Sequence, residues 1–309
     1  MVQKPSVIIV SGPTCVGKTE VAIALAERLG GEIISADAMQ VYRYMDIGTA
    51  KPNKEQMARV PHHLIDVLGP DEPFSAASFR TMAGSIIADL HEKGKAVFVV
   101  GGTGLYIKAL TQGLFQVPGE DSAIRERLKA EANTLGLEAI YGRLKRADPK
   151  GAAKIHPKDT YRVIRALEIF ELTGKPISEH HMTHEFSDKP YRVLKIGLFM
   201  DREILYHRIN ERVERMLSQG FLDEVKGLLE RGYGPALKSM QSIGYRHVLA
   251  FLLENVGWDE TVRLFKRDTR RYAKRQFTWF RADPEIQWRQ PEEVDFMGKE
   301  IDAFLTRAL

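Results

Sequence analysis

The sequence of 309 residues predicts an α/β fold in which a parallel sheet core is interrupted by a helical insertion. Three observations predict it. Short apolar runs alternate with helical stretches in the first hundred residues, which is typical of parallel strands joined by crossover helices. From residue 122 to residue 174 the periodicity is helical throughout. The chain is 44% apolar and 28% charged, which is the balance of a folded globular protein.

The first part of the chain alternates strand and helix. Residues 7–10 are a β-branched run, and the glycine-rich turn after them leads into a helix that ends at Gly30 and Gly31. Residues 96–100 are an apolar run that ends in two glycines, as expected for a buried parallel strand. We expect, in order, a strand at 7–10, a helix at 18–29, strands at 32–35 and 62–67, a helix at 78–93 and a strand at 96–100.

The second part of the chain is mostly helical. Asp159 has the character of an N-cap, and Gly174 with Pro176 has that of a helix stop. Residues 173–189 are expected to form a loop. We expect a strand at 193–200 and helices at 203–218, 222–231, 242–255 and 259–281. The sequence therefore predicts a core of residues 1–118 and 190–309, and a helical insertion domain at 119–189.

The composition excludes several classes of protein. Cys15 is the one cysteine, so neither an intramolecular disulfide nor a cysteine zinc site can form, which suits a reducing cytosol. No apolar run approaches the roughly 18 residues that cross a bilayer. We therefore expect a cytoplasmic protein without membrane contact.

The positive charge is concentrated near the C-terminus. The whole chain carries +4, whereas residues 263–281 alone hold eight basic residues and one acid, Asp268. Aromatic residues are interleaved with these basic ones. Such a segment is either a solvated amphipathic helix or a surface that binds nucleic acid, and charge alone favours neither.

The strongest motif is a phosphate-binding P-loop. Residues 12–19 read GPTCVGKT, which matches G-x-x-x-x-G-K-[ST] and lies between a predicted strand and a predicted helix. In such a loop the backbone N–H groups point at an anion, the lysine adds a charge and the final hydroxyl binds Mg²⁺. We expect the diphosphate-binding residues to be Gly12, Pro13, Thr14, Cys15, Val16, Gly17, Lys18 and Thr19, with Thr19 as the Mg²⁺ ligand.

An ordinary P-loop ATPase also needs an acidic residue after an apolar strand. Here the strand at 96–100 is followed by Gly-Gly-Thr-Gly, with Thr103 and no acid. Asp37 follows another strand instead. Because ligands of open parallel sheets bind at the carboxyl ends of the strands, Asp37, Thr103 and the P-loop are expected to line one crevice.

Taken together, the motifs resemble those of the bacterial tRNA dimethylallyltransferases, also called tRNA isopentenyltransferases. The resemblance extends over nearly the whole chain. It is carried by GPTCVGKT (12–19), SADAMQVY (35–42), PHHLID (61–66), VGGTGLY (100–106), IHPKDTYRVIRALE (155–168), QSIGY (241–245) and RRYAKRQFTWFR (270–281).

The resemblance implies a reaction and roles for its catalytic residues. A dimethylallyl group would pass from dimethylallyl diphosphate to N6 of the adenosine at tRNA position 37, with Mg²⁺ as cofactor. The P-loop would hold the diphosphate rather than ATP, which accounts for the missing acid. Asp37 would be the general base, Lys18 and Arg212 would bind the leaving diphosphate, and Thr103 would lie beside the substrate adenosine.

The resemblance also implies residues that contact the anticodon stem loop of tRNA, in a protein that acts as a monomer. One group surrounds the catalytic carboxylate, a second lies in the insertion and a third in the C-terminal part. These residues are Asp37, Ala38, Met39, Gln40 and Thr103; Arg125, Arg127, Tyr161, Arg162 and Arg165; and Gln241, Gly244, Tyr245, Arg270, Arg271, Lys274 and Arg275.

Two residues depart from the family pattern: Ala38 stands where serine is usual, and Lys158 stands where asparagine is common. Three alternatives remain. An adenylate isopentenyltransferase would modify free adenine nucleotides and would need neither the insertion nor the basic helix. A small-molecule kinase would use ATP in the same loop. A non-catalytic RNA-binding protein would keep the P-loop only as a relic.

Overall fold

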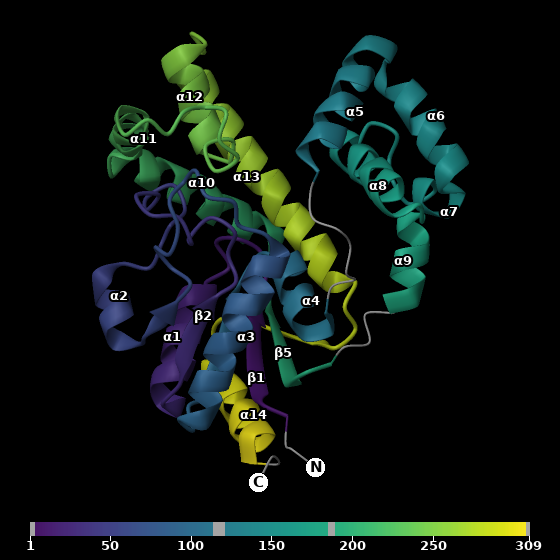
Figure 1. Ribbon diagram of the computed structural model, residues 1–309. Helices are drawn as coiled ribbons and strands as arrows, with labels where there is room; N and C mark the ends of the chain where they lie inside the picture. Colours follow the sequence, from purple (N-terminus) through teal and green to yellow (C-terminus); the bar gives the residue numbers. More distant parts are fainter. Residues whose placement is uncertain (1–3, 114–120, 185–188, 307–309) are drawn as a thin grey trace. The chain divides into compact units, whose positions relative to one another are not determined.

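The computed structural model describes residues 4–113, 121–184 and 189–306 (Figure 1). The chain divides into two compact units. Unit 1 contains residues 1–111 and 189–309, and unit 2 contains residues 112–188. Unit 2 overlaps the helical insertion expected at 119–189.

Unit 1 is built on a six-stranded sheet in which every described strand pair is parallel. The strand order is β3-β2-β4-β1-β5-β6. The strands are β1 (Ser6–Ser11), β2 (Glu32–Ser35), β3 (His62–His63), β4 (Val97–Gly101), β5 (Arg192–Leu198) and β6 (Ile286–Arg289). Val7 of β1 pairs with Val97 of β4, and Ser11 pairs with Gly101, so β1 and β4 end side by side.

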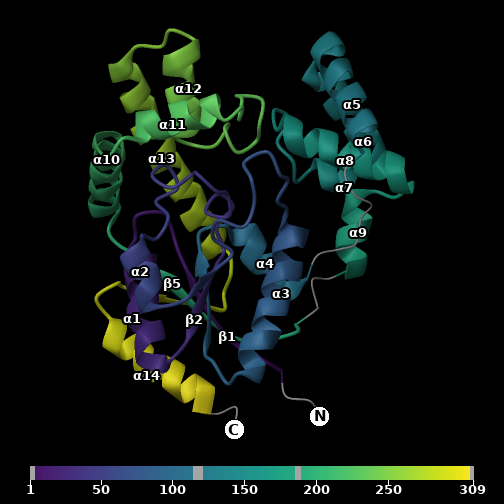
Figure 2. The ribbon, with the colours of Figure 1, turned by 60° about the vertical axis from the view of Figure 1, so that its left-hand side comes forward.

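The sheet is covered by helices on both faces (Figure 2). Alternate strand residues point to opposite faces, so Ile8 packs with α1 and α14 while Ile9 packs with α3 and α4. The helices of unit 1 are α1 (Lys18–Leu29), α2 (Lys54–Arg59), α3 (Ala76–Glu92), α4 (Gly104–Gln112), α10 (Arg202–Ser218), α11 (Phe221–Glu230), α12 (Tyr245–Leu253), α13 (Trp258–Arg281) and α14 (Val294–Thr306).

A third apolar cluster joins the helices α10 to α13 to the segment after β2. Val41, Tyr42 and Met45 of that segment are buried among residues of these helices, such as Phe221 and Phe265. Glu224 of α11 strengthens this attachment because its carboxylate accepts hydrogen bonds from the backbone N–H groups of residues 46–48. The C-terminal helices thus hold the chain segment that begins at the catalytic candidate Asp37.

Unit 2 is a small helical domain with its own core. Its helices are α5 (Ser122–Leu135), α6 (Leu137–Ala147), α7 (Pro149–Ala152), α8 (Thr160–Thr173) and α9 (Ile177–His184). Leu128, Leu144 and Val163 come from three of these helices and are fully buried together. Asp148 ties the short helices to one another, because its carboxylate accepts from the backbone N–H of Gly151 and from the hydroxyl of Ser178.

Most predicted elements are confirmed, and two predictions are wrong. The strand predicted at 62–67 ends at His63, because Leu64 and Asp66 take positive φ angles of 61° and 56°, which turn the backbone out of the extended conformation. The loop predicted at 173–189 contains α9. The elements α2, α4, β6 and α14 were not predicted. Within the described residues, no helix has the length and apolarity that crossing a bilayer requires.

Candidate active site

The P-loop joins β1 to α1 as the motif predicts. β1 ends at Ser11 and α1 begins at Lys18. Gly12 has a φ of 145°, and a Cβ atom there would lie 2.6 Å from the backbone oxygen of Leu198. Gly17 precedes α1 with a φ of 100°. Both glycines are therefore required by the backbone, and the start of α1 is left open to an anion.

The side chain of Lys18, the first residue of α1, folds back onto the P-loop. Its ammonium donates to the backbone oxygens of Gly12 at 3.0 Å and Pro13 at 2.7 Å. Its pKa is lowered to about 8, chiefly because the ammonium is buried; the Asp37 carboxylate opposes this shift and the nearby Arg212 adds to it. Lys18, Arg212 and Asp37 therefore lie within electrostatic range of one another, although they come from three separate segments.

Arg212 reaches the P-loop from α10. Its guanidinium donates to the hydroxyl of Thr14 at 3.4 Å and contacts the sulfur of Cys15 at 3.6 Å. Cys15 has a φ of 67°, a left-handed conformation that is uncommon outside glycine. The loop thus has one cation from its own helix and one from a distant helix, as expected for binding a diphosphate.

Asp37 follows the end of β2, and its carboxylate is held by backbone N–H groups of the next residues in the chain. One oxygen of its carboxylate accepts from the backbone N–H of Met39 at 2.8 Å and of Gln40 at 3.3 Å. The other carboxylate oxygen accepts no hydrogen bond from the described residues. Gln40 is itself held, because its side-chain oxygen accepts from the hydroxyl of Ser35 at 2.9 Å.

Thr103 lies next to this turn, at the end of β4. Its hydroxyl accepts from the backbone N–H of Ala38 at 3.2 Å, and its own N–H donates to the backbone oxygen of Ala36 at 3.2 Å. A Cβ atom at Gly101 would lie 2.1 Å from that same oxygen. The glycine therefore lets the ends of β2 and β4 approach closely enough for Thr103 and Asp37 to be neighbours.

Two tyrosines that the sequence did not single out also surround Asp37. Tyr272 of α13 and Tyr106 of α4 both have a raised pKa, mainly because they are buried and further because the Asp37 carboxylate is near. Both phenols therefore stay protonated at neutral pH. They occupy apolar-face positions of amphipathic helices, where a tyrosine is indistinguishable from a core residue in sequence.

A third residue that sequence reasoning missed is Gln276 of α13. Its side chain is 7% exposed. It bonds to Thr14 of the P-loop at one end and to Gly102, in the loop that carries Thr103, at the other. The signal in the sequence was an uncharged polar residue on the buried face of a basic helix.

Thr19 is the residue at the P-loop whose hydroxyl would bind a magnesium ion. Thr19 is partly exposed in the first turn of α1, beside Lys18. Among the described residues, no three His, Cys, Asp or Glu side chains gather in a way that could hold a metal. A hydroxyl with few protein carboxylates suits Mg²⁺, which commonly keeps its waters and completes its shell with substrate phosphates.

The predicted tRNA-binding residues of unit 1 differ in their exposure. Arg271, Lys274 and Arg275 of α13 are exposed. Arg270 is partly buried and donates to the side chain of Asn210 at 2.6 Å. Gln241 is exposed, and its amide donates to the backbone oxygen of Pro235.

Two further residues of this predicted set are buried. Tyr245 is 0% exposed, and its hydroxyl donates to Glu224 at 2.6 Å. Gly244 is buried with a φ of 95°, and a Cβ atom there would meet the ring of Phe265 at 2.9 Å. Tyr245 supports the segment after β2 through Glu224, and Gly244 lies against the rings of Phe265 and Phe221.

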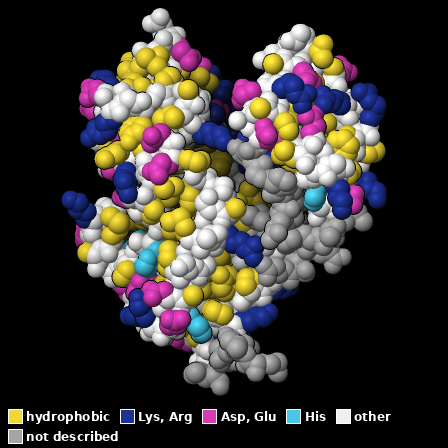
Figure 3. Space-filling view, viewed as in Figure 1, with side chains coloured by type: hydrophobic (Ala, Val, Ile, Leu, Met, Phe, Trp, Pro, Cys, Tyr) yellow, Lys and Arg dark blue, Asp and Glu magenta, His cyan; other side chains and the backbone are white. Residues whose placement is uncertain are grey.

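The predicted tRNA-binding residues of unit 2 fall into two groups. Tyr161 and Arg162 lie in the first turn of α8 and are more than 60% exposed. Arg125 and Arg165 are mostly buried, and both pair with Glu168, which is fully buried. Arg127 is about half exposed and pairs with Glu131 and Glu171. Acidic and basic side chains are intermixed on this unit in Figure 3.

The sequence matches a known protein family. A family model described as IPP transferase matches residues 40–283. A protein from Syntrophus aciditrophicus named tRNA dimethylallyltransferase 2 is 56% identical over 98% of this chain and 98% of its own. The tRNA dimethylallyltransferase of Geobacter metallireducens is 52% identical over 99% of this chain and 97% of its own.

Solved structures agree with this match. The tRNA isopentenylpyrophosphate transferase of Bacillus halodurans superposes with a TM-score of 0.73 at 42% identity, and the match covers 99% of this chain and 98% of that one. A eukaryotic dimethylallyltransferase, described as acting on tRNA, superposes with a TM-score of 0.72 at 32% identity over 89% of this chain and 69% of its own.

Proposed function

The chain belongs to the IPP transferase family of tRNA dimethylallyltransferases, and we propose that it transfers the dimethylallyl group of dimethylallyl diphosphate to N6 of the adenosine at position 37 of tRNA. The protein is thus a prenyltransferase. Its relatives are named for the transfer to tRNA. The proposal also includes dimethylallyl diphosphate as the donor, recognition of the anticodon stem loop, and action as a monomer.

One observation carries the proposal: a phosphate-binding loop and a carboxylate share one edge of the sheet. The P-loop follows β1, Asp37 follows β2 and Thr103 follows β4. The strands β2, β4 and β1 are adjacent and parallel, so their carboxyl ends meet at the same edge. A kinase would need an acid after β4 for its metal, and the residues there are glycines and Thr103.

The proposed reaction is a displacement at an allylic carbon. The N6 nitrogen of the adenosine forms a bond to C1 of the dimethylallyl group, and the bond from C1 to the diphosphate oxygen breaks with its electron pair on the diphosphate. The N6 proton passes to the Asp37 carboxylate. An exocyclic amine is a poor nucleophile, so removal of this proton contributes about 10²- to 10⁴-fold to the rate.

The leaving diphosphate gains negative charge as the bond breaks. Lys18, Arg212 and the N–H groups at the start of α1 all lie at the P-loop, where they would stabilise that charge. A magnesium ion held by Thr19 would neutralise part of the same charge. The Thr103 hydroxyl accepts from Ala38, so its proton remains available to donate to the adenosine.

The adenosine must leave its stack to reach Asp37, because N6 is inaccessible within a stacked loop. The exposed arginines and lysine of α13 would hold the phosphates of the stem loop without reading its sequence. This basic face also argues against the adenylate isopentenyltransferase alternative, since a free nucleotide needs no extended cationic helix.

A transfer assay tests the proposal. Purified protein, Mg²⁺ and labelled dimethylallyl diphosphate are incubated with unmodified tRNA in one reaction, and with AMP, ADP and ATP in another. We expect label in tRNA alone, and in an isolated anticodon stem loop that carries adenosine 37. A stem loop with guanosine at that position is the control, because it lacks the N6 amine, and it is expected to stay unlabelled.

The other outcomes would each select an alternative. Label in the free nucleotides would favour an adenylate isopentenyltransferase. Phosphate released from ATP, with no label in either acceptor, would favour a kinase. Binding of tRNA without any transfer would favour the non-catalytic RNA-binding protein.

A further inference from the structure

Gln276 is a polar residue on the buried face of the basic helix α13. Its neighbours along that face, Ala273 and Phe280, are fully or almost fully buried apolar residues. Gln276 itself is 7% exposed. A buried amide is costly unless both of its ends are hydrogen-bonded, so its presence here calls for specific partners.

The two ends of the Gln276 amide bond to two different loops of the active site. Its side-chain oxygen accepts from the backbone N–H of Thr14 at 2.8 Å. Its NH₂ group donates to the backbone oxygen of Gly102 at 3.0 Å. Thr14 belongs to the P-loop after β1, and Gly102 precedes Thr103 after β4. One side chain therefore bridges the diphosphate-binding loop and the loop that carries Thr103.

The second loop is shaped to receive α13. A Cβ atom at Gly102 would lie 2.1 Å from the Gln276 nitrogen. A Cβ atom at Gly104 would lie 2.1 Å from the Trp279 ring nitrogen. The glycines on both sides of Thr103 are thus required by close contact with one helix.

We infer that Gln276 is a positioning residue, which holds the P-loop and the Thr103 loop in one fixed relation. The inference rests on the proposed function. Gln276 accepts from the Thr14 N–H, which ties the P-loop to α13. The same side chain holds Gly102, the residue before Thr103. The donor and the adenosine would therefore be presented together, and such fixed geometry raises the rate of a two-substrate reaction.

An amide suits this position better than a carboxylate. It offers an acceptor to Thr14 and a donor to Gly102 at once, whereas a glutamate offers acceptors only. A glutamate would also place negative charge beside the diphosphate.

The first test replaces the amide while keeping its volume. Gln276→Met preserves side-chain length but leaves Thr14 N–H and Gly102 oxygen without their partner. We expect the KM for dimethylallyl diphosphate and the Kd for inorganic pyrophosphate to rise about tenfold, the scale of one buried unsatisfied group. The Kd for tRNA should change less than twofold. Thr278→Ala, an exposed position on the same helix, is the matched control and should match wild type in all three.

The second test separates positioning from support of the fold. Gln276→Glu should bind pyrophosphate more weakly than Gln276→Met, because it adds charge while it keeps the acceptor for Thr14. Gly102→Ala keeps the Gln276 amide but displaces it from its partners. Both variants then disturb the same contact, so in the double variant their losses of pyrophosphate affinity should not be additive.

The outcomes decide each claim separately. Pyrophosphate affinity within twofold of wild type in folded Gln276→Met would overturn the inference. Full additivity with Gly102→Ala would overturn it as well. A wild-type protein that binds pyrophosphate yet transfers no dimethylallyl group would refute the proposed function. The difference in pyrophosphate affinity between wild type and Gln276→Met would still test the positioning role of Gln276.

Discussion

The hydroxyl of Thr103 accepts a hydrogen bond of 3.2 Å from the backbone N–H of Ala38, and this contact joins the ends of β4 and β2. Ala38 follows the Asp37 carboxylate directly, so Thr103 holds the turn in which Asp37 lies. Sixty-five positions separate the two residues in the chain. The proposed general base and the residue proposed to touch the adenosine are therefore fixed to each other.

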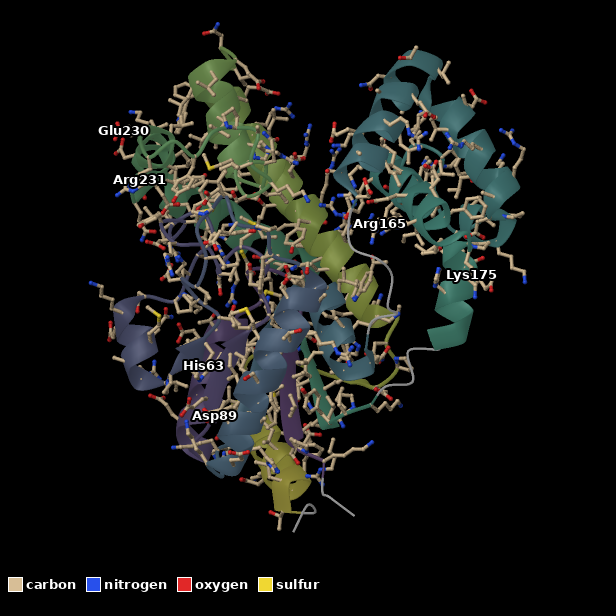
Figure 4. All side chains as sticks on the ribbon, in the orientation of Figure 1. His63, Asp89, Arg165, Lys175, Glu230 and Arg231 are labelled. Atoms are coloured by element: carbon tan, nitrogen blue, oxygen red, sulfur yellow. The ribbon has the colours of Figure 1, made fainter. Side chains whose placement is uncertain are left out.

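Replacing Asp37 by asparagine should abolish most of the turnover while the site keeps its shape. Asparagine retains the oxygen that accepts from Met39 and Gln40, but it cannot take a proton from N6. We expect kcat to fall about 10²- to 10⁴-fold, with an unchanged Kd for tRNA. Rates come from single-turnover transfer. Asp89→Asn is the control, because Asp89 is an exposed carboxylate on α3 that pairs with Lys93 (Figure 4). Near-normal turnover of Asp37→Asn would refute the general-base role.

Thr103→Val and Thr103→Ser should separate the hydroxyl from the bulk of the side chain. Valine keeps the shape but leaves Ala38 N–H without its acceptor, whereas serine keeps the hydroxyl. We expect valine to lower kcat/KM for tRNA about tenfold and serine to stay within about threefold of wild type. Steady-state transfer to the anticodon stem loop measures both. Equal losses in the two variants would show that the hydroxyl has no role.

The affinity for the diphosphate donor should depend on the ionisation of Lys18. The pKa of Lys18 is lowered to about 8, and its ammonium is the form that attracts the diphosphate. Binding should therefore be strong below pH 8 and weaken as the pH rises above it. Dimethylallyl diphosphate binding without tRNA, followed by calorimetry from pH 6.5 to 9.5, measures this. Lys18→Arg, which stays charged, should bind with no such decline, and a flat wild-type profile would contradict the prediction.

The exposed basic side chains of α13 should contribute to tRNA affinity by neutralising phosphates. Arg271→Ala combined with Arg275→Ala should weaken tRNA binding and lower the slope of log K against log salt by about one for each phosphate that is no longer neutralised. Titrations at several salt concentrations measure the slope. Arg263→Ala is the control on the same helix, since Arg263 pairs with Glu260. An unchanged slope in the double variant would exclude these two residues from the interface.

Tyr245→Phe should affect stability rather than RNA binding. The buried hydroxyl donates to Glu224, whose carboxylate holds the segment after β2. Loss of this bond should lower the free energy of unfolding by about 1–2 kcal/mol. Chemical denaturation measures it, and tRNA affinity should remain that of wild type. A weakened tRNA affinity at unchanged stability would restore Tyr245 as a contact residue.

Local patterns were sufficient for much of this fold. The strands β1, β2 and β4 and the helix α1 were predicted because apolar runs and capping glycines report local structure directly. The elements β6 and α9 were not predicted, because their sequences carry no clear local pattern. β6 reads Ile-Gln-Trp-Arg with mixed polarity, as an edge strand allows, and α9 has no strong apolar stripe.

The sequence by itself determined the chemistry of this protein: the P-loop, the carboxylate after β2 and the absence of an acid after β4 all belong to short contiguous motifs. Only the tertiary structure decided which residues meet. Gln276 bonds to Thr14 across 262 positions, Arg212 reaches the P-loop across 198, and Tyr245 is buried. A short motif determines the local backbone conformation of its own residues. A contact between distant segments depends instead on how whole helices pack against the sheet.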